Sequence, residues 1–186
     1  TGVLNRRQEV VGVKDESWGG VDSLVEEITA AGGTAMAQLG DISVAEDAQR
    51  MVDTAAAWRG RLDILVNGAG VNLRKPAGAF RREDFEGLMR INVEAAFFIS
   101  QAAGQVMRER RWGRIICIGS IAAEVAIPNI ALYAMSKGGV RQMVKSLALE
   151  WAKDGVTVNA IAPGRFWTKM TDAVFSDERL HQLGWG

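Results

Sequence analysis

Hydrophobic and polar residues follow two different periods along the chain. Short apolar runs rich in β-branched residues predict buried strands at Gln8–Val13, 34–41, 62–70, 113–120 and 156–164. Between these runs, apolar residues recur at helical spacing and predict helices at 21–33, 43–58, Arg82–Glu109 and Ile130–Lys153. Gly32 and Gly33 are the expected stop of the first helix. Ser43 is the expected N-cap of the second, with Glu46 completing a capping box.

Strands that are apolar on both faces and alternate with amphipathic helices predict an α/β fold. In such a fold a parallel sheet is covered by helices on both sides, and ligands bind outside the carboxyl ends of the strands. Small or polar residues follow four of the predicted strands, in the segments "GDIS", "NGAG", "GS" and "NAIAPG". We therefore expect these segments to line one binding crevice.

Composition narrows the class of protein. The 186 residues are 48% hydrophobic and 24% charged, which predicts a single globular domain over residues 1–186. Lys+Arg and Asp+Glu both total 22, so no charge excess indicates nucleic acid, and no apolar run reaches the roughly 20 residues that a membrane span needs. The single cysteine, Cys117, is expected to pack in the core of a cytoplasmic protein. With one histidine, His181, neither a metal site nor a Ser/His/Asp triad is expected.

The stretch "ALYAMSKGGV" places Tyr133 and Lys137 four residues apart, on one face of the last predicted helix. A free tyrosine has a pKa near 10 and is a poor base at neutral pH, whereas a neighbouring ammonium stabilises a tyrosinate. The pair therefore has the chemistry of proton transfer. The alternative is that Tyr133 is a packed ring and Lys137 faces water.

Further motifs accompany this pair: "NGAG", Asn92 in the third predicted helix, Ser120 after the fourth strand, and "PGRFWT" at the end of the fifth. With them, the chain resembles the short-chain dehydrogenase/reductase family from about Gln8 to Thr171. The resemblance implies that Tyr133 is the acid/base and that Lys137 stabilises the tyrosinate and holds the nicotinamide ribose. It also implies that Ser120 hydrogen-bonds the substrate oxygen and that Asn92 holds a water that relays protons from Lys137.

The same resemblance implies a Rossmann-type, doubly wound parallel sheet that binds NAD or NADP. The implied coenzyme-binding residues, besides Tyr133 and Lys137, are Asp15, Asp41, Ile42, Asn67, Ala69, Gly70, Pro163, Gly164, Phe166 and Thr168. Asp41 and Ile42 are expected beside the adenine. Asp15 follows the first predicted strand, where an acid binds the ribose 2′-hydroxyl, which favours NAD; Lys14 beside it argues the other way.

The chain departs from the family pattern at both ends. The family's first strand, its Thr-Gly-x-x-x-Gly-x-Gly loop and its first helix are missing, and the C-terminal strand is missing too. Either the chain is a relative without a coenzyme site, or the sequence joins segments that are not contiguous in the protein. The intact motifs favour the second explanation, with gaps expected near Val3–Arg7 and Leu183–Trp185.

The segments "GVNLRKPAGAF" and "PGRFWTKMT" resemble the sugar-acid branch of the family, which includes gluconate 5-dehydrogenases. This implies hydride transfer between nicotinamide and a secondary alcohol or ketone of a sugar acid or polyol. Arg74 and Lys75 form a clamp for the substrate carboxylate unless they lie in a solvated turn; Arg74 is the predicted substrate contact. One alternative is a 3-oxoacyl-carrier-protein reductase. A basic patch near the active site would favour it, because its substrate arrives on an acidic carrier, and Arg108, Arg110 and Arg111 form the densest cationic cluster. A non-catalytic scaffold is the other alternative.

The two long helices, Arg82–Glu109 and Ile130–Lys153, are expected to pair between subunits of a homodimer or homotetramer.

Overall fold

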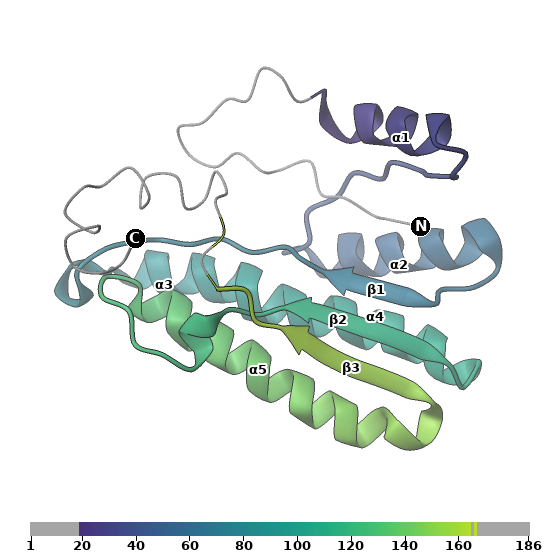
Figure 1. The fold of residues 1–186 in the computed structure, drawn as a ribbon. Helices are drawn as coiled ribbons and strands as arrows, with labels where there is room; N and C mark the ends of the chain where they lie inside the picture. Colours follow the sequence, from purple (N-terminus) through teal and green to yellow (C-terminus); the bar gives the residue numbers. More distant parts are fainter. Residues whose placement is uncertain (1–18, 165, 167–186) are drawn as a thin grey trace.

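The computed structural model describes residues 19–164 and residue 166, which form a parallel sheet with helices packed against it (Figure 1). Its strands are β1 (Ile64–Asn67), β2 (Gly113–Ile118) and β3 (Val156–Ile161). Its helices are α1 (Gly20–Ala30), α2 (Ala45–Arg59), α3 (Arg82–Met89), α4 (Ala95–Glu109) and α5 (Ala131–Trp151). Shorter helical turns are η1 (Ala77–Ala79), η2 (Arg90–Glu94), η3 (Ile121–Ala123) and η4 (Ala152–Asp154).

The strands lie in the order β1-β2-β3, and both pairings are parallel. Helices α3 and α4 connect β1 to β2, and α5 connects β2 to β3. Strand β2 is central: Ile64 pairs with Arg114 on one side of it, and Val158 pairs with Ile115 on the other. These are the crossover connections of a Rossmann-type fold, as the apolar strands and intervening helices predict.

The core of the described residues lies on one face of this sheet. Val52 of α2, Ile99 of α4 and Val144 of α5 belong to one hydrophobic cluster with Ile115 and Val158 of the strands. On the opposite face, Ile64 and Val66 are 50% and 60% exposed. The predicted parallel sheet is confirmed, whereas helices cover a single face within the described part of the chain.

The predicted long helix Arg82–Glu109 is continuous, but it contains one π-helical turn, η2, between α3 and α4. A π-helical turn inserts one extra residue and shifts the helix face that follows it. Here it contains Asn92, whose side chain is buried. The last predicted helix is also confirmed, since α5 and η4 together end within one residue of Lys153.

Two predicted features near α2 are wrong. Residues 34–41 form no strand, because the described sheet consists of β1, β2 and β3 and none of these strands pairs with this segment. The segment contacts α2: Gln38 donates to Thr54 Oγ1 at 3.1 Å, and Arg50 donates to the Leu39 carbonyl at 3.5 Å. Ser43 is not the N-cap, since α2 begins at Ala45. Its hydroxyl donates to Asp41 Oδ1 at 2.7 Å, so the Ser43 side chain bonds a residue of the preceding turn and does not cap α2.

Several predictions concern residues outside the described part of the chain. These are the strand Gln8–Val13, the proposed gaps near Val3–Arg7 and Leu183–Trp185, and the roles of Asp15 and Thr168. Among the described helices, none combines the length and the apolarity that a bilayer crossing requires.

Candidate active site

The carboxyl ends of β2 and β3 converge at one edge of the sheet. The backbone N–H of Gly119 donates to the Ile161 carbonyl at 2.7 Å, and that of Ile121 donates to the Pro163 carbonyl at 3.2 Å. A side chain at Gly119 would crowd the chain opposite, since an added Cβ would lie 3.1 Å from the Ile161 carbonyl oxygen. These bonds bring together two of the four segments that were predicted to line one crevice, and the crevice itself stays a prediction.

Lys137 joins α5 to this edge. Its ammonium donates a hydrogen bond of 2.7 Å to the carbonyl of Ile118, the last residue of β2, and only 6% of the residue is exposed. The Lys137 Nζ atom lies 5.7 Å from the ring centroid of Tyr133, one helical turn earlier. Burial lowers the pKa of Lys137, and this effect outweighs an opposing one from Cys117. The alternative in which Lys137 faces water is therefore wrong.

Asn92 holds the segment that follows β1. Its side-chain Oδ1 accepts the Val71 N–H at 2.8 Å, and its Nδ2 donates to the Val71 carbonyl at 2.9 Å. The same Nδ2 donates to the hydroxyl of Ser136 at 3.0 Å. Residues 71, 92 and 136 are far apart in sequence, so Asn92 ties the loop after β1 to helix α5.

Ser136 is a site residue that the sequence analysis missed. It is fully buried, and its hydroxyl donates to the Tyr133 carbonyl at 2.7 Å while accepting from Asn92. The available signal was its position, three residues after Tyr133, because a helical serine often bonds a carbonyl one turn back.

Gly70 lies between the two polar side chains of the site. A Cβ placed there would lie 3.4 Å from Asn92 Oδ1 and 3.6 Å from Lys137 Nζ. Its missing side chain therefore leaves a space beside the ammonium, which fits the close approach of a coenzyme. The neighbouring Asn67 is buried, and its amide donates to the Ala96 carbonyl of α4 at 3.1 Å, so its side chain holds the strand end in place. Ala69 packs partly buried against the core.

Ser120 follows β2 and begins the turn η3, against which α5 packs. Its hydroxyl oxygen accepts the Ala122 N–H at 3.1 Å. Because that bond occupies an acceptor lone pair, the hydroxyl hydrogen is free to point toward a substrate oxygen. Ser120 and Tyr133 thus lie on two packed elements at the same edge of the sheet.

The loop after β1 carries Arg74, which is exposed. Next to it, Lys75 forms an ion pair of 2.7 Å with Asp84 of α3, and its backbone N–H donates to the Asn129 carbonyl at 2.9 Å. The Lys75 ammonium holds the pKa of Asp84 below its ordinary value, with help from the Arg81 N–H. Lys75 is therefore engaged by the protein, while Arg74 extends from an anchored loop.

The other predicted coenzyme contacts fall at two places. Asp41 and Ile42 lie in the turn before α2, where the Asp41 N–H donates to Asp47 at 2.7 Å and Ile42 is buried in the core. Pro163, Gly164 and Phe166 follow β3 at the edge described above, and Phe166 is exposed.

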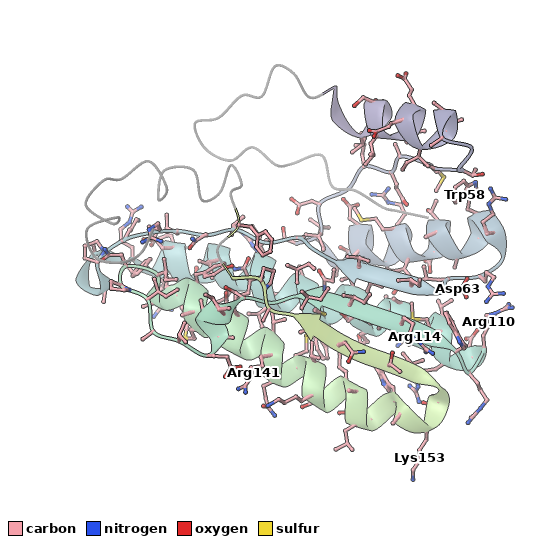
Figure 2. The ribbon with its side chains drawn as sticks, in the orientation of Figure 1. Trp58, Asp63, Arg110, Arg114, Arg141 and Lys153 are labelled. Atoms are coloured by element: carbon pink, nitrogen blue, oxygen red, sulfur yellow. The ribbon has the colours of Figure 1, made fainter. Side chains whose placement is uncertain are left out.

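The arginine cluster lies at the other end of the sheet. Arg108 pairs with Asp154, Arg110 donates to the Gly60 carbonyl at 3.3 Å, and Arg111 donates to the Lys153 carbonyl at 2.6 Å. Figure 2 shows Arg110 and Lys153 at the end where β2 and β3 begin, far from the strand ends that carry Ser120. The cluster therefore fastens loops together and does not border the candidate site.

The parallel sheet, its crossover helices and the residues gathered at the carboxyl ends of its strands define a Rossmann-type α/β protein. Comparison with known proteins agrees with this class. The profile described as "short chain dehydrogenase" matches residues 4–179. The chain belongs to this family.

Gluconate 5-dehydrogenase of Gluconobacter oxydans is 39% identical over 137 residues, which are 72% of this chain and 54% of the relative. A 3-oxoacyl-[acyl-carrier-protein] reductase of Synechocystis is 35% identical over 81% of this chain and 61% of the relative. A gluconate 5-dehydrogenase of Burkholderia cenocepacia, solved with NADP and tartrate, superimposes with a TM-score of 0.85 at 33% identity; the match covers 97% of this chain and 68% of that structure. The chain spans about half the length of the first of these relatives.

Proposed function

We propose that the protein is an NAD(P)-dependent oxidoreductase that moves a hydride between nicotinamide and a secondary alcohol or ketone, with Tyr133 as the acid/base. The observation that carries the proposal is the placement of Lys137. Its ammonium is buried, bonded to the end of β2 and one helical turn from the tyrosine. Burying a cation costs free energy, and a buried ionisable group with a shifted pKa is a candidate functional residue.

When bound, the nicotinamide supplies or accepts the hydride, and the chain provides the proton and the orientation. As the hydride arrives at a carbonyl carbon, negative charge develops on its oxygen, and the Tyr133 hydroxyl donates a proton there. The Lys137 cation then stabilises the charge left on the phenolic oxygen. The Ser120 hydroxyl, whose oxygen already accepts the Ala122 N–H, donates to the same substrate oxygen. In the oxidative direction each step runs in reverse.

Lys137 has donors left for the coenzyme. An ammonium has three N–H groups, and among the described residues one of them bonds the Ile118 carbonyl. The remaining two suit hydroxyl groups of a ribose, and the space at Gly70 lies directly beside Nζ. The water-relay role of Asn92 remains part of this proposal. The Burkholderia cenocepacia structure contains NADP, while Asp15, which favours NAD, lies outside the described residues.

We further propose a sugar acid as the substrate. The sugar-acid relatives support this, and tartrate, itself a hydroxy acid, was solved in one of them. Within this chain, Arg74 is an exposed guanidinium on the loop that follows Gly70–Val71, and an arginine binds a carboxylate through two parallel N–H bonds. Lys75 is a weaker candidate than Arg74 for binding the substrate carboxylate, because its ammonium already pairs with Asp84.

The testing experiment is an oxidation and reduction screen of the full-length protein with NAD and NADP. Its substrates are gluconate and other sugar acids, neutral polyols, and a 3-oxoacyl thioester. Turnover of a sugar acid supports the proposal. Preference for the thioester would support the carrier-protein reductase instead, although the arginine cluster lies away from the site. Absence of coenzyme binding and of all turnover would support the scaffold.

The carboxylate clamp has its own test. Arg74→Ala is expected to raise KM for a sugar acid by about tenfold or more, because a charge-assisted pair is lost. KM for a neutral polyol should stay within twofold. The matched control is Arg82→Ala, which removes an exposed arginine on α3 that pairs only loosely, at 3.6 Å, with Glu86. Equal effects on acidic and neutral substrates would argue against the clamp.

We propose that α4 and α5 pair with their copies in a second subunit. A groove between these helices is lined by both apolar and polar side chains, among them Phe97, Met143, Trp151, Gln101 and Glu150. Leu149 of α5 is 81% exposed, and an exposed leucine on one of two long helices favours association with a second copy. Sedimentation of the full-length protein should show a dimer or tetramer, and Leu149→Glu should shift it toward monomer. A monomeric wild type would contradict the proposal.

A further inference from the structure

Helix α5 carries a buried hydroxyl that belongs to none of the roles assigned above. Ser136 lies between Tyr133 and Lys137 in sequence, and it is 0% exposed. Its Oγ is 2.7 Å from the Tyr133 carbonyl and 3.0 Å from Asn92 Nδ2. A serine that merely filled space at this position would need neither bond.

The direction of every hydrogen bond in this network is determined. The Asn92 side-chain atom that lies 2.8 Å from the Val71 N–H must be the amide oxygen, Oδ1, because an N–H group needs an acceptor. The Nδ2 group is then a donor and reaches both the Val71 carbonyl and Ser136. Ser136 must therefore accept from Asn92 and send its own hydrogen to the Tyr133 carbonyl, since a carbonyl can only accept. Alanine can do neither.

The network leads from the turn with the reactive pair to the space beside the ammonium. Ser136 holds the Asn92 amide, and that amide holds both backbone groups of Val71. Gly70, next to Val71, approaches Lys137 Nζ closely enough that an added Cβ would lie 3.6 Å away. Asn92 itself lies in the π-helical turn η2, and its side chain bonds both Val71 and Ser136.

We propose that Ser136 is a positioning residue of the active site. By bridging Asn92 to the Tyr133 carbonyl, it sets the loop at Gly70–Val71 relative to the turn that carries Tyr133 and Lys137. This inference rests on the proposed oxidoreductase function. A shift of about 1 Å in such a frame is enough to lower turnover by a large factor, because reacting groups must stay within a narrow range of distance and angle.

The experiment compares Ser136→Ala, Ser136→Thr and Ser136→Cys in the full-length protein. Ser136→Ala should lower kcat by about tenfold or more and raise the coenzyme KM, while KM for the second substrate changes little. Ser136→Thr keeps the hydroxyl and should restore most of kcat. The control is Ser100→Ala, which removes an equally buried serine of α4 that lies outside this network.

Ser136→Cys covers the case in which the alanine variant does not fold. It keeps nearly the same volume but is a weak donor and acceptor, so it should lose kcat like the alanine variant while its circular dichroism stays native. A Ser136→Cys or folded Ser136→Ala enzyme with kcat and coenzyme KM within twofold of wild type would overturn the inference.

A second measurement does not depend on turnover. Deuterium exchange of a peptide covering residues 68–72 should be faster in Ser136→Ala than in wild type or Ser100→Ala, because the Val71 N–H is then held by a less restrained Asn92. Unchanged exchange would overturn the positioning role even if the wild type were active. An inactive wild type would instead count against the proposed oxidoreductase, and the exchange result would still decide whether Ser136 positions this loop.

Discussion

Lys137 Nζ donates a 2.7 Å hydrogen bond to the Ile118 carbonyl, and this bond joins α5 to the carboxyl end of β2. The acceptor is the carbonyl of the last residue of β2, and Gly119 and Ser120 follow it in the chain. The ammonium is therefore held at the sheet edge by the fold itself. Because the Lys137 side chain is buried and hydrogen-bonded, its ammonium keeps one position relative to Tyr133 and Gly70.

Tyr133→Phe tests the proton-transfer role directly. The variant keeps the ring beside Lys137 and removes the hydroxyl, so kcat should fall by about 10²- to 10⁴-fold. Coenzyme affinity, followed by tryptophan fluorescence, should stay within a few fold of wild type. A variant that retains more than a tenth of wild-type kcat would show that another group handles the proton.

Lys137→Met should change the pH dependence of stability. Burial lowers the pKa of Lys137 in the folded protein, whereas in the unfolded chain a lysine titrates near pH 10.4. Between these two values the unfolded state binds more protons, so Lys137 makes the folded protein more stable as pH rises through that window. The variant lacks this gain. Its free energy of unfolding should therefore rise less with pH than that of wild type.

Urea unfolding at several alkaline pH values measures this difference. Lys145→Met removes an exposed lysine of the same helix and should preserve the wild-type slope. Parallel pH profiles for wild type and Lys137→Met would contradict the expectation.

Gly70→Ala separates folding from coenzyme binding. The added methyl would meet Asn92 Oδ1 at 3.4 Å and Lys137 Nζ at 3.6 Å, which are ordinary contact distances, so the free energy of unfolding should change by less than about 1 kcal/mol. The methyl occupies the space beside the ammonium, so the coenzyme Kd should rise. In the control Gly78→Ala, an added Cβ meets nothing within 4 Å. Equal Kd values for both variants would place the coenzyme elsewhere.

Asn92→Ala should destabilise the protein more than Asn67→Ala. Asn92 is 1% exposed, and its removal leaves both backbone groups of Val71 without their side-chain partners, which should cost about 2–4 kcal/mol. Asn67 makes one such bond, to the Ala96 carbonyl, and its loss should cost about 1–2 kcal/mol. Urea unfolding compares the two variants, and the opposite ranking would contradict the importance of the loop contact.

Local patterns in the sequence were sufficient for most elements. Continuous apolar runs predict β1, β2 and β3, and four segments with helical spacing predict the helices of the described residues, with α3 and α4 as one. These patterns are local because each reflects which residues of one element are buried. They failed at residues 34–41, where an apolar run bonds to α2 instead of to a strand. They also placed the start of α2 too early, because Ser43 bonds Asp41 and not the helix.

The arginine cluster shows why charge in a sequence does not specify a surface. Arg108 lies in the last turn of α4, and Arg110 and Arg111 follow that helix. A helix that connects two parallel strands must run back from the carboxyl end of one strand to the amino end of the next. The crossover between two parallel strands therefore places these arginines at the end of the sheet opposite to the candidate site. This placement follows from how the elements pack and not from the charges themselves.

By itself, the sequence determined the fold class, the family resemblance and the pairing of Tyr133 with Lys137, since residues four apart share a helix face in any protein. The tertiary structure decided that Lys137 is buried, that Asn92 holds Val71 and that Ser136 links Asn92 to the turn of Tyr133. The physical reason is range. Helical periodicity is set by neighbours in the chain, whereas desolvation and hydrogen bonds between residues 71, 92 and 136 arise only when distant segments pack together.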